Sequence, residues 1–367
     1  MRVASGVAVI FCVASVFAEI SFYSEKYLDK AYSNDDKNDA IAATATSQNS
    51  SNRNPSSSNF DQNNSEFITL LKDIQINVVA PASDVDEEKM EELKSIKSLN
   101  LNIPQRCFSG NDSQIPLTSD EIRFSCLTEA LFDDKTTVIW ALRGGYSSAK
   151  LIPYLQKLFP KPKKEKYFIG FSDITALHLF FTQKWGWKTI YGSVISEILD
   201  TKKYDQQNFI KIAKIISGRE SVPKITGLIP LNLNAKKLGT KNIVGKLTGG
   251  NLAVVETSLA TKWQINAFGK ILFLEDVNVE AYMVDRSLIH LKQAGIFDGV
   301  KAIIFGTVGD DSDGILEVLK NVSSALKIPA FKTDKFGHEH FNFPIIYNTF
   351  SMIVPTLNNT FDLVMKL

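Results

Sequence analysis

The sequence predicts an α/β protein, with a parallel sheet covered by helices in the first folded part of the chain and a second domain after it. Apolar, β-rich runs alternate with segments of helical periodicity, a pattern typical of parallel sheets. Glycine-rich or polar turns follow two of these runs directly, at the sheet edge where such folds bind ligands. A length of 367 residues exceeds what one average domain needs, and 44% hydrophobic residues is ordinary for a globular chain.

The overall charge does not indicate a polyanionic partner. Lys and Arg total 41 against 40 Asp and Glu, so no bulk positive charge favours nucleic acid or an anionic membrane surface. The basic run at residues 161–166 is short and is interpreted as a solvated loop. We therefore expect no nucleic-acid partner.

The N-terminus has the pattern of an export signal. Arg2 precedes a charge-free apolar stretch at residues 3–17, and Val16 and Ala18 place small residues where a signal peptidase reads. The stretch is shorter than the roughly 20 residues of a membrane span. We expect a signal peptide at residues 1–18, a periplasmic or secreted protein, and no integral membrane span after cleavage. An uncleaved anchor is the alternative.

A polar, Ser- and Asn-rich stretch follows and contains almost no large apolar residue. Such a segment cannot bury enough surface to offset its chain entropy, which predicts a disordered tether at residues 19–66. The remaining chain is divided into a first domain at 67–200, a linker at 201–235 and a second domain at 236–367.

The first domain opens with alternating strands and helices. Strands are expected at residues 74–80, 99–103 and 137–142, and helices at 84–99 and 118–132. The strand at 137–142 runs into the turn Arg143-Gly144-Gly145-Tyr146.

Ser172 lies between the next strand and the next helix. An apolar run at residues 167–169 is followed by Gly170, which permits a sharp turn, and then by an apolar helical face that begins at Ile174. This arrangement is typical of a nucleophile elbow, although Ile174 replaces the usual second glycine. A polar residue that caps the helix is the alternative interpretation.

The rest of the chain is predicted to carry polar groups at the ends of strands. A helix is expected at 207–216, before the second domain, and Thr248-Gly249-Gly250-Asn251-Leu252 follows a strand at 242–247. The buried strand at 270–277 ends in Glu275 and Asp276. A helix at 281–294 and a strand at 302–306 come next.

The cysteines and histidines do not form a metal motif. After signal cleavage only Cys107 and Cys126 remain, and because their spacing does not force them together we expect two free thiols, although export would permit a disulfide. The histidines (His178, His290, His338 and His340) lack zinc-ligand spacing. We expect no metal and no cofactor.

Six short motifs together resemble the LD-carboxypeptidase family, which includes muramoyl-tetrapeptide carboxypeptidases and microcin C immunity proteins. In order they are Arg143-Gly144-Gly145-Tyr146, Gly170-Phe171-Ser172-Asp173, Gly249-Gly250-Asn251-Leu252, Phe273-Leu274-Glu275-Asp276, Asp285-Arg286 and Gly337-His338. The resemblance covers about residues 74–345. It implies a Rossmann-like, parallel-sheet N-terminal domain, a smaller β-rich C-terminal domain, and a homodimer.

The resemblance also implies roles for individual residues. Ser172 would be the nucleophile, His338 the general base and Glu275 the carboxylate that orients it. Backbone N–H groups of Asp173 and of Gly144 or Gly145 would form the oxyanion hole, and the substrate-binding candidates are Arg143 and Asn251.

Alternatives remain open at four of these positions. Glu275 could instead pair with Arg286, leaving Asp276 as the orienting acid, and His340 competes with His338. Arg143 could equally have a structural role in its turn, and Asn251 could fix a turn. The family continues Arg-Gly-Gly-Tyr with glycine where this chain has Ser147, which would reshape that loop if the position requires a positive φ.

The function expected from this resemblance is removal of the terminal D-alanine from a murein tetrapeptide in peptidoglycan turnover. One alternative is a microcin C-like peptidyl-nucleotide hydrolase, for which Trp263 is a candidate to stack on the base. The other is a murein-binding module without catalysis.

Overall fold

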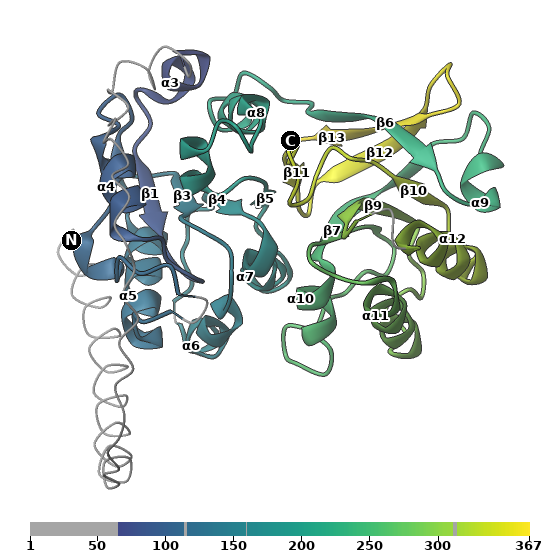
Figure 1. Ribbon diagram of the computed structural model, residues 1–367, viewed down its shortest axis with the longest axis horizontal. Helices are drawn as coiled ribbons and strands as arrows, with labels where there is room; N and C mark the ends of the chain where they lie inside the picture. The colour runs from purple at the N-terminus through teal and green to yellow at the C-terminus, as the bar shows by residue number, and fades with distance from the viewer. Residues whose placement is uncertain (1–64, 114–115, 159, 311–313) are drawn as a thin grey trace, which may run out of the picture. The chain divides into compact units, whose positions relative to one another are not determined.

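The computed structural model describes residues 65–367, except for 114, 115, 159 and 311–313. The predicted signal peptide at 1–18 and nearly all of the predicted tether lie outside the described residues. The described chain forms a parallel sheet followed by a closed β-barrel, so the prediction of a Rossmann-like first part and a β-rich second part is confirmed (Figure 1).

The first sheet has six strands in the order β11-β5-β4-β3-β1-β2. Its parallel strands are short and their side chains are largely buried, which explains why they read as continuous apolar runs. They are β1 (Ile76–Val79), β2 (Leu101–Asn102), β3 (Val138–Ala141), β4 (Tyr167–Gly170) and β5 (Ile190–Tyr191). The sixth strand, β11 (Ile345–Ile346), comes from the C-terminal part and pairs antiparallel with β5.

Helices pack around this sheet (Figure 1). They are α3 (Ser65–Leu71), α4 (Glu87–Ser95), α5 (Asp120–Phe132), α6 (Ile152–Lys157), α7 (Thr175–Phe180) and α8 (Gln206–Ile216). Side-chain hydrogen bonds cap the first turns of α4 and α5. The Asp86 carboxylate accepts from Lys89 N at 2.8 Å, and Ser119 Oγ accepts from Ile122 N at 3.3 Å.

The barrel has seven strands in the order β10-β6-β13-β12-β7-β8-β9. These are β6 (Lys224–Pro230), β7 (Ile243–Asn251), β8 (Ile271–Asp276), β9 (Ala302–Val308), β10 (Ala330–Lys332), β12 (Phe350–Pro355) and β13 (Phe361–Lys366). Strand β6 lies inside residues 201–235, which we interpreted as a linker. Its mixed polarity misled that interpretation: Ile225 and Leu228 are buried, whereas Lys224, Thr226, Gly227 and Ile229 are exposed.

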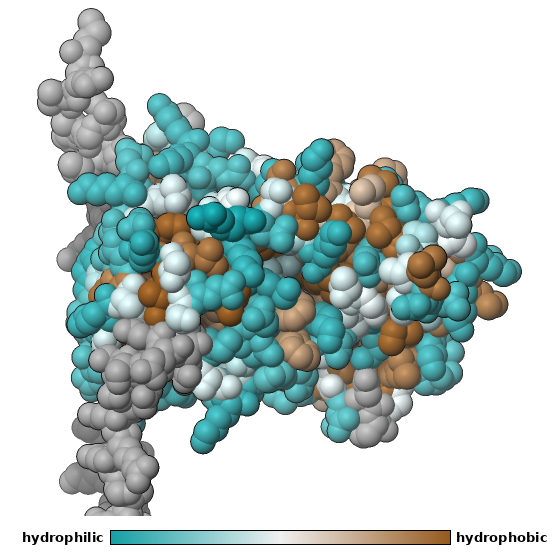
Figure 2. Space-filling view, turned by 90° about the horizontal axis from the view of Figure 1, so that it is seen from above, coloured by the Kyte–Doolittle hydropathy of each residue, from teal (hydrophilic) through white to brown (hydrophobic). Residues whose placement is uncertain are grey.

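The described residues of this second part form the helices α9 (Leu233–Lys236), α10 (Leu252–Thr257), α11 (Ala281–Gln293) and α12 (Ile315–Leu326). Surface residues are mostly hydrophilic in the face that Figure 2 presents, with apolar residues in small groups between them. No helix within residues 65–367, apart from the gaps given above, is long and apolar enough to cross a membrane.

The expectation of two free thiols is wrong. Cys107 and Cys126 form a disulfide with their Cα atoms 5.9 Å apart. Cys107 ends the short 3-10 helix η1 (Gln105–Cys107), which packs beside Cys126 on α5. Spacing in the sequence could not reveal this pairing, because helix–helix packing brings the two residues together.

We predict that removing the disulfide by the double change Cys107→Ser and Cys126→Ser lowers the free energy of unfolding by about 3 kcal/mol, because the unfolded chain gains loop entropy. Urea denaturation with and without reductant measures this, and the double variant should not respond to reductant. Alkylation of both cysteines in unreduced protein would contradict the prediction.

Candidate active site

Ser172 lies at a sharp turn between β4 and the helical segment that follows. Its φ is +62°, a left-handed value that few non-glycine residues adopt, and a short 3-10 helix, η3 (Ser172–Ile174), leads into α7. Ile174, which replaces the second elbow glycine, is fully buried beneath the turn. The backbone therefore has the elbow geometry without that glycine.

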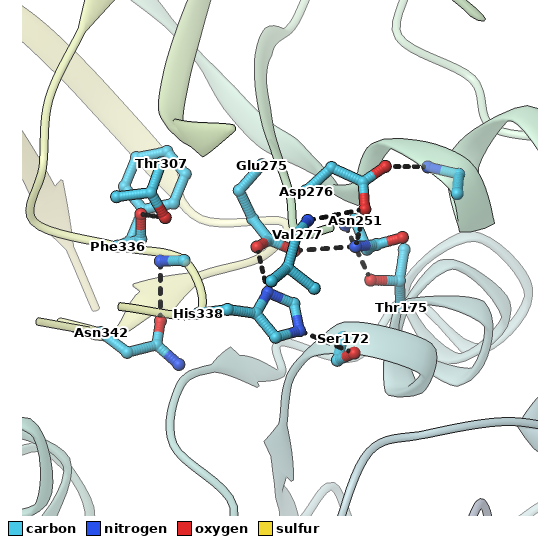
Figure 3. Close-up of polar contacts among 12 residues, drawn as sticks. Ser172, Thr175, Asn251, Glu275, Asp276, Val277, Thr307, Phe336, His338 and Asn342 are labelled. Carbon is cyan, nitrogen blue, oxygen red and sulfur yellow. Dashed lines mark hydrogen bonds and ion pairs between the residues drawn. The ribbon is translucent and has the colours of Figure 1, made fainter. Parts of the chain in front are cut away.

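Ser172, His338 and Glu275 form one hydrogen-bonded line (Figure 3). His338 Nε2 lies 2.9 Å from Ser172 Oγ, and His338 Nδ1 lies 2.6 Å from Glu275 Oε2. The serine comes from the parallel sheet, whereas the glutamate ends β8 of the barrel and the histidine lies in the loop after β10. Three segments far apart in sequence thus meet at one point.

Glu275 is held by two further donors. Its side chain is completely buried, and its second oxygen, Oε1, accepts from the Tyr191 hydroxyl at 2.5 Å and from Asn251 Nδ2 at 3.2 Å. Burial, together with the nearby Glu275, raises the pKa of Tyr191 well above its ordinary value, so the hydroxyl remains a donor. Every polar atom of the carboxylate therefore has a partner, and its orientation is fixed.

Tyr191 also reaches the serine turn. Its hydroxyl oxygen accepts from Ser172 N at 3.4 Å, so one side chain at the end of β5 touches both the acid and the backbone of the serine. Tyr191 is not among the residues predicted for the site. The available signal was its position, because it ends an apolar run just before a glycine at the same sheet edge as Ser172.

Asn251 lies behind Glu275. Its Oδ1 caps α10 by accepting from Val254 N, its Nδ2 donates to Glu275 and Asp276, and the residue is 5% exposed. The structure therefore does not bring Asn251 into the cleft as a substrate contact. Instead its backbone N–H donates to Thr175 Oγ1 on α7 at 3.0 Å, which ties the barrel to the serine helix.

Neither alternative considered for the carboxylate that orients His338 is found in the structure. Asp276 accepts from Ala253 N at 3.0 Å and from Asn251, at the start of α10, and it makes no contact with the imidazole. Arg286 lies over the ring of Tyr282, not beside Glu275.

His338 has an environment that favours its protonated form. Burial alone would lower the pKa of His338, but the charges of Glu275, Glu197 and Asp276 outweigh it and raise that pKa above its ordinary 6.5. The Phe171 ring packs against the imidazole at 4.7 Å between centroids. Gly337, at φ +131°, lies so close to Thr307 that a side chain would collide there, which explains the glycine before the histidine.

The other histidines have different partners. His340 contacts the Lys203 carbonyl and Asp205, and His290 contacts Glu256. His178 is fully buried between Thr189 and the Gly170 carbonyl, and burial lowers its pKa to about 3. Within the described ranges, no three or more His, Cys, Asp or Glu side chains are placed to hold a metal ion.

Ser172 and His338 open into a cleft of about 650 Å³. Arg143, Gly144 and Gly145 line it, and so do residues of both charges: Lys89, Asp112, Glu197, Asp200 and Lys203. Arg143 forms an ion pair with Asp112 and donates to the Asp84 carbonyl at 3.0 Å. Arg143 thus combines a structural contact with a position in the cleft.

The predicted oxyanion-hole residues flank Ser172. A side chain on Gly144 would come within 2.9 Å of Ser172 Cβ, so only glycine lets this backbone lie against the serine. Gly145 has φ +98° and packs against Ser83. Asp173 is the second residue of η3, and its carboxylate accepts from Ser148 N at 2.8 Å.

Ser147, the departure from the family pattern, keeps a left-handed backbone. Its φ is +89° and it is buried, so serine occupies the conformation that glycine would adopt freely. Ser148 next to it donates from Oγ to the Asp173 carbonyl at 2.7 Å. The loop beside the elbow is therefore anchored despite the substitution.

The chain is similar to known proteins in both of its parts. Residues 76–192 match the LD-carboxypeptidase N-terminal domain, and residues 244–352 match the LD-carboxypeptidase C-terminal domain. A Rickettsia conorii protein provisionally named a carboxypeptidase is 54% identical over 295 residues, covering 80% of this chain and 92% of that protein. The murein tetrapeptide carboxypeptidase of Pseudomonas aeruginosa is 28% identical over 235 residues, covering 59% and 72%.

Solved structures share the fold at low identity. The muramoyltetrapeptide carboxypeptidase of Oxalobacter formigenes aligns with a TM-score of 0.62 at 20% identity, covering 80% of this chain and 99% of that one. The microcin C7 self-immunity protein aligns with a TM-score of 0.67 at 20% identity, covering 81% and 96%. Two matching domain models in the right order, with a relative above half identity, lead to one conclusion: the chain belongs to the LD-carboxypeptidase family.

Proposed function

We propose that this protein is a serine-type LD-carboxypeptidase that removes the terminal D-alanine from murein tetrapeptides. The observation that carries the proposal is the line from Ser172 Oγ through His338 to Glu275, with separations of 2.9 and 2.6 Å. A serine beside a neutral imidazole, itself oriented by a carboxylate, is the arrangement that activates a hydroxyl for acyl transfer.

The positions of these atoms support the following reaction. His338 Nε2 accepts the proton of Ser172 as Oγ attacks the carbonyl of the scissile bond, and Glu275 stabilises the imidazolium through Nδ1. The imidazolium then protonates the departing D-alanine amine. Water, activated by the same imidazole, hydrolyses the acyl-enzyme and releases the shortened peptide.

Two features of the cleft suit this substrate. Negative charge that develops on the carbonyl oxygen would meet the backbone N–H groups of Asp173 and of Gly144 or Gly145, beside the serine. The substrate's terminal carboxylate would meet Arg143, which lines the same cleft as Ser172.

We favour murein peptides over peptidyl-nucleotides as the substrate for one reason. Trp263, the residue considered for stacking on a base, is 8% exposed and does not line the cleft that contains Ser172. We also propose export through residues 1–18, which would place the enzyme at peptidoglycan outside the cytoplasm, and a homodimer.

Full-length protein should release one alanine from disaccharide-tetrapeptide, and Ser172→Ala should lower kcat roughly 10⁶-fold because the nucleophile is lost. Mass spectrometry of the products measures both. His338→Gln should behave similarly, whereas His340→Gln, two residues away, should retain activity. Equal activity of wild type and Ser172→Ala would contradict the proposed catalytic triad. A folded wild-type protein without activity would favour the peptidyl-nucleotide or binding-module alternatives.

The pH profile of kcat/KM should fall on its acid side with a midpoint above 6.5. The base must be neutral to accept the serine proton, and the raised pKa of His338 moves that limit to higher pH. Steady-state rates between pH 5 and 9 measure it. A midpoint below 6.5 would mean that burial dominates over the carboxylates.

Tyr191→Phe should lower kcat about tenfold while leaving KM nearly unchanged. The change removes one hydrogen bond to a buried carboxylate, and the freed Glu275 oxygen keeps Asn251 as its partner. Kinetics beside Tyr347→Phe provide the control, because the Tyr347 hydroxyl donates to the Gly249 carbonyl instead of Glu275. An unchanged kcat would show that Asn251 and His338 suffice to orient the acid.

A further inference from the structure

Arg143 brings a guanidinium group into the active-site cleft, and a carboxylate of the chain itself pairs with it there. Arg143 lines the cleft together with Ser172 and precedes Gly144, whose backbone lies against the serine. Its Nη1 donates to the Asp84 carbonyl at 3.0 Å and forms an ion pair with Asp112, which lines the same cleft. The side chain of Arg143 is 35% exposed and that of Asp112 is 43% exposed, so a ligand in the cleft can reach both groups.

The position of Asp112 is fixed by the fold around it. Asp112 lies in the loop between η1 and α5, two residues beyond Gly110. The Asp84 carboxylate holds the start of this loop, because it accepts from Ser109 Oγ at 3.0 Å and from Gly110 N at 3.2 Å. Asp84 therefore holds both members of the ion pair, Arg143 through its carbonyl and the Asp112 loop through its carboxylate.

The two lysines that line the cleft have other partners. Lys89 Nζ lies 3.5 Å from the Asp86 carboxylate, and Lys203 Nζ lies over the Tyr204 ring at 5.0 Å. Arg143 is thus the cleft cation that stands beside the serine turn. The group already paired with it is a carboxylate, which is the chemical class that a guanidinium binds best.

A ligand carboxylate and Asp112 would compete for this guanidinium. A carboxylate that binds the fork of N–H donors on Arg143 either displaces Asp112 or lies beside it, and two like charges at that distance repel each other. The ion pair is half exposed, so water screens it and its separation costs little free energy. Asp112 can therefore give way without any change in the rest of the fold.

We propose that Asp112 is an internal competitor of the ligand: it neutralises Arg143 in the free protein and so sets the affinity of the cleft for the carboxylate group of a substrate or product. Asp112 acts through Arg143 and is a specificity-determining residue. The ligand class follows from the ion pair itself, whereas its identity as the terminal carboxylate of a peptide rests on the proposed peptidase function.

The test compares the peptide L-Ala-γ-D-Glu-L-Lys-D-Ala with the same peptide amidated at its C-terminus. The two differ only in the terminal charge. Binding is measured by calorimetry on full-length Ser172→Ala, which removes the nucleophile. Adding Asp112→Asn should tighten binding of the acid roughly two- to fivefold, as expected for the loss of a half-exposed ion pair, and leave binding of the amide unchanged.

A second variant locates the effect. Arg143→Gln should abolish the preference for the acid over the amide, and in that background Asp112→Asn should have no further effect, because its action requires the guanidinium. Glu317→Gln, on the exposed face of α12, removes the same charge elsewhere and should leave both affinities unchanged. Circular dichroism checks that each variant is folded.

Unchanged or weaker binding of the acid on Asp112→Asn, a gain that persists in Arg143→Gln, or no binding of either peptide would overturn the proposal. Release of alanine by the wild type is measured separately. Tighter binding of the acid that depends on Arg143, without alanine release, would support the competition and refute the peptidase function. Alanine release with no effect of Asp112→Asn on binding would do the reverse.

Discussion

Glu275 is the group on which the arrangement of the whole protein depends. It is fully buried, and its partners come from every part of the fold: His338 from the loop after β10, Asn251 from β7, and Tyr191 from the parallel sheet. A buried charge is tolerated only when its hydrogen bonds are all made. The two halves must therefore pack in one relative position. The hydrogen bond from Asn251 N to Thr175 on the serine helix fixes that position a second time.

The serine turn provides the other constraint. A left-handed φ at a non-glycine residue costs free energy and persists only where the surroundings enforce it. Gly144 supplies the space beside Ser172, and Tyr191 contacts the Ser172 amide from the end of the neighbouring strand β5. Ser147 carries the same strain two residues after Gly145, so the loop and the elbow are braced together through Asp173 and Ser148.

Much of the fold was predictable because its signals are local. The short apolar runs and the caps at Asp86 and Ser119 mark strands and helix starts, and the motif residues Ser172, Glu275 and His338 do lie together. What escaped prediction depends on tertiary packing. Cys107 and Cys126 form their disulfide because η1 packs beside α5. The sequence of β6 is mixed in polarity because several of its residues are exposed. The position of Asn251 behind Glu275 follows from the register of β7 with β8. Tyr191 has only a positional signal in the sequence, because its contacts to Glu275 and Ser172 form only when the two halves pack together.

The pairing of β11 with β5 has a consequence for how the chain is made. The parallel sheet is completed by Ile345 and Ile346, which are synthesised long after their partner strand β5. Until β11 is synthesised, β5 has an unpaired edge, and unpaired strand edges promote aggregation. The two halves are therefore not interchangeable modules. A gene fragment that stops before the C-terminal part encodes a sheet without its outer strand, and shuffling or splitting this protein between its two halves would fail at that edge.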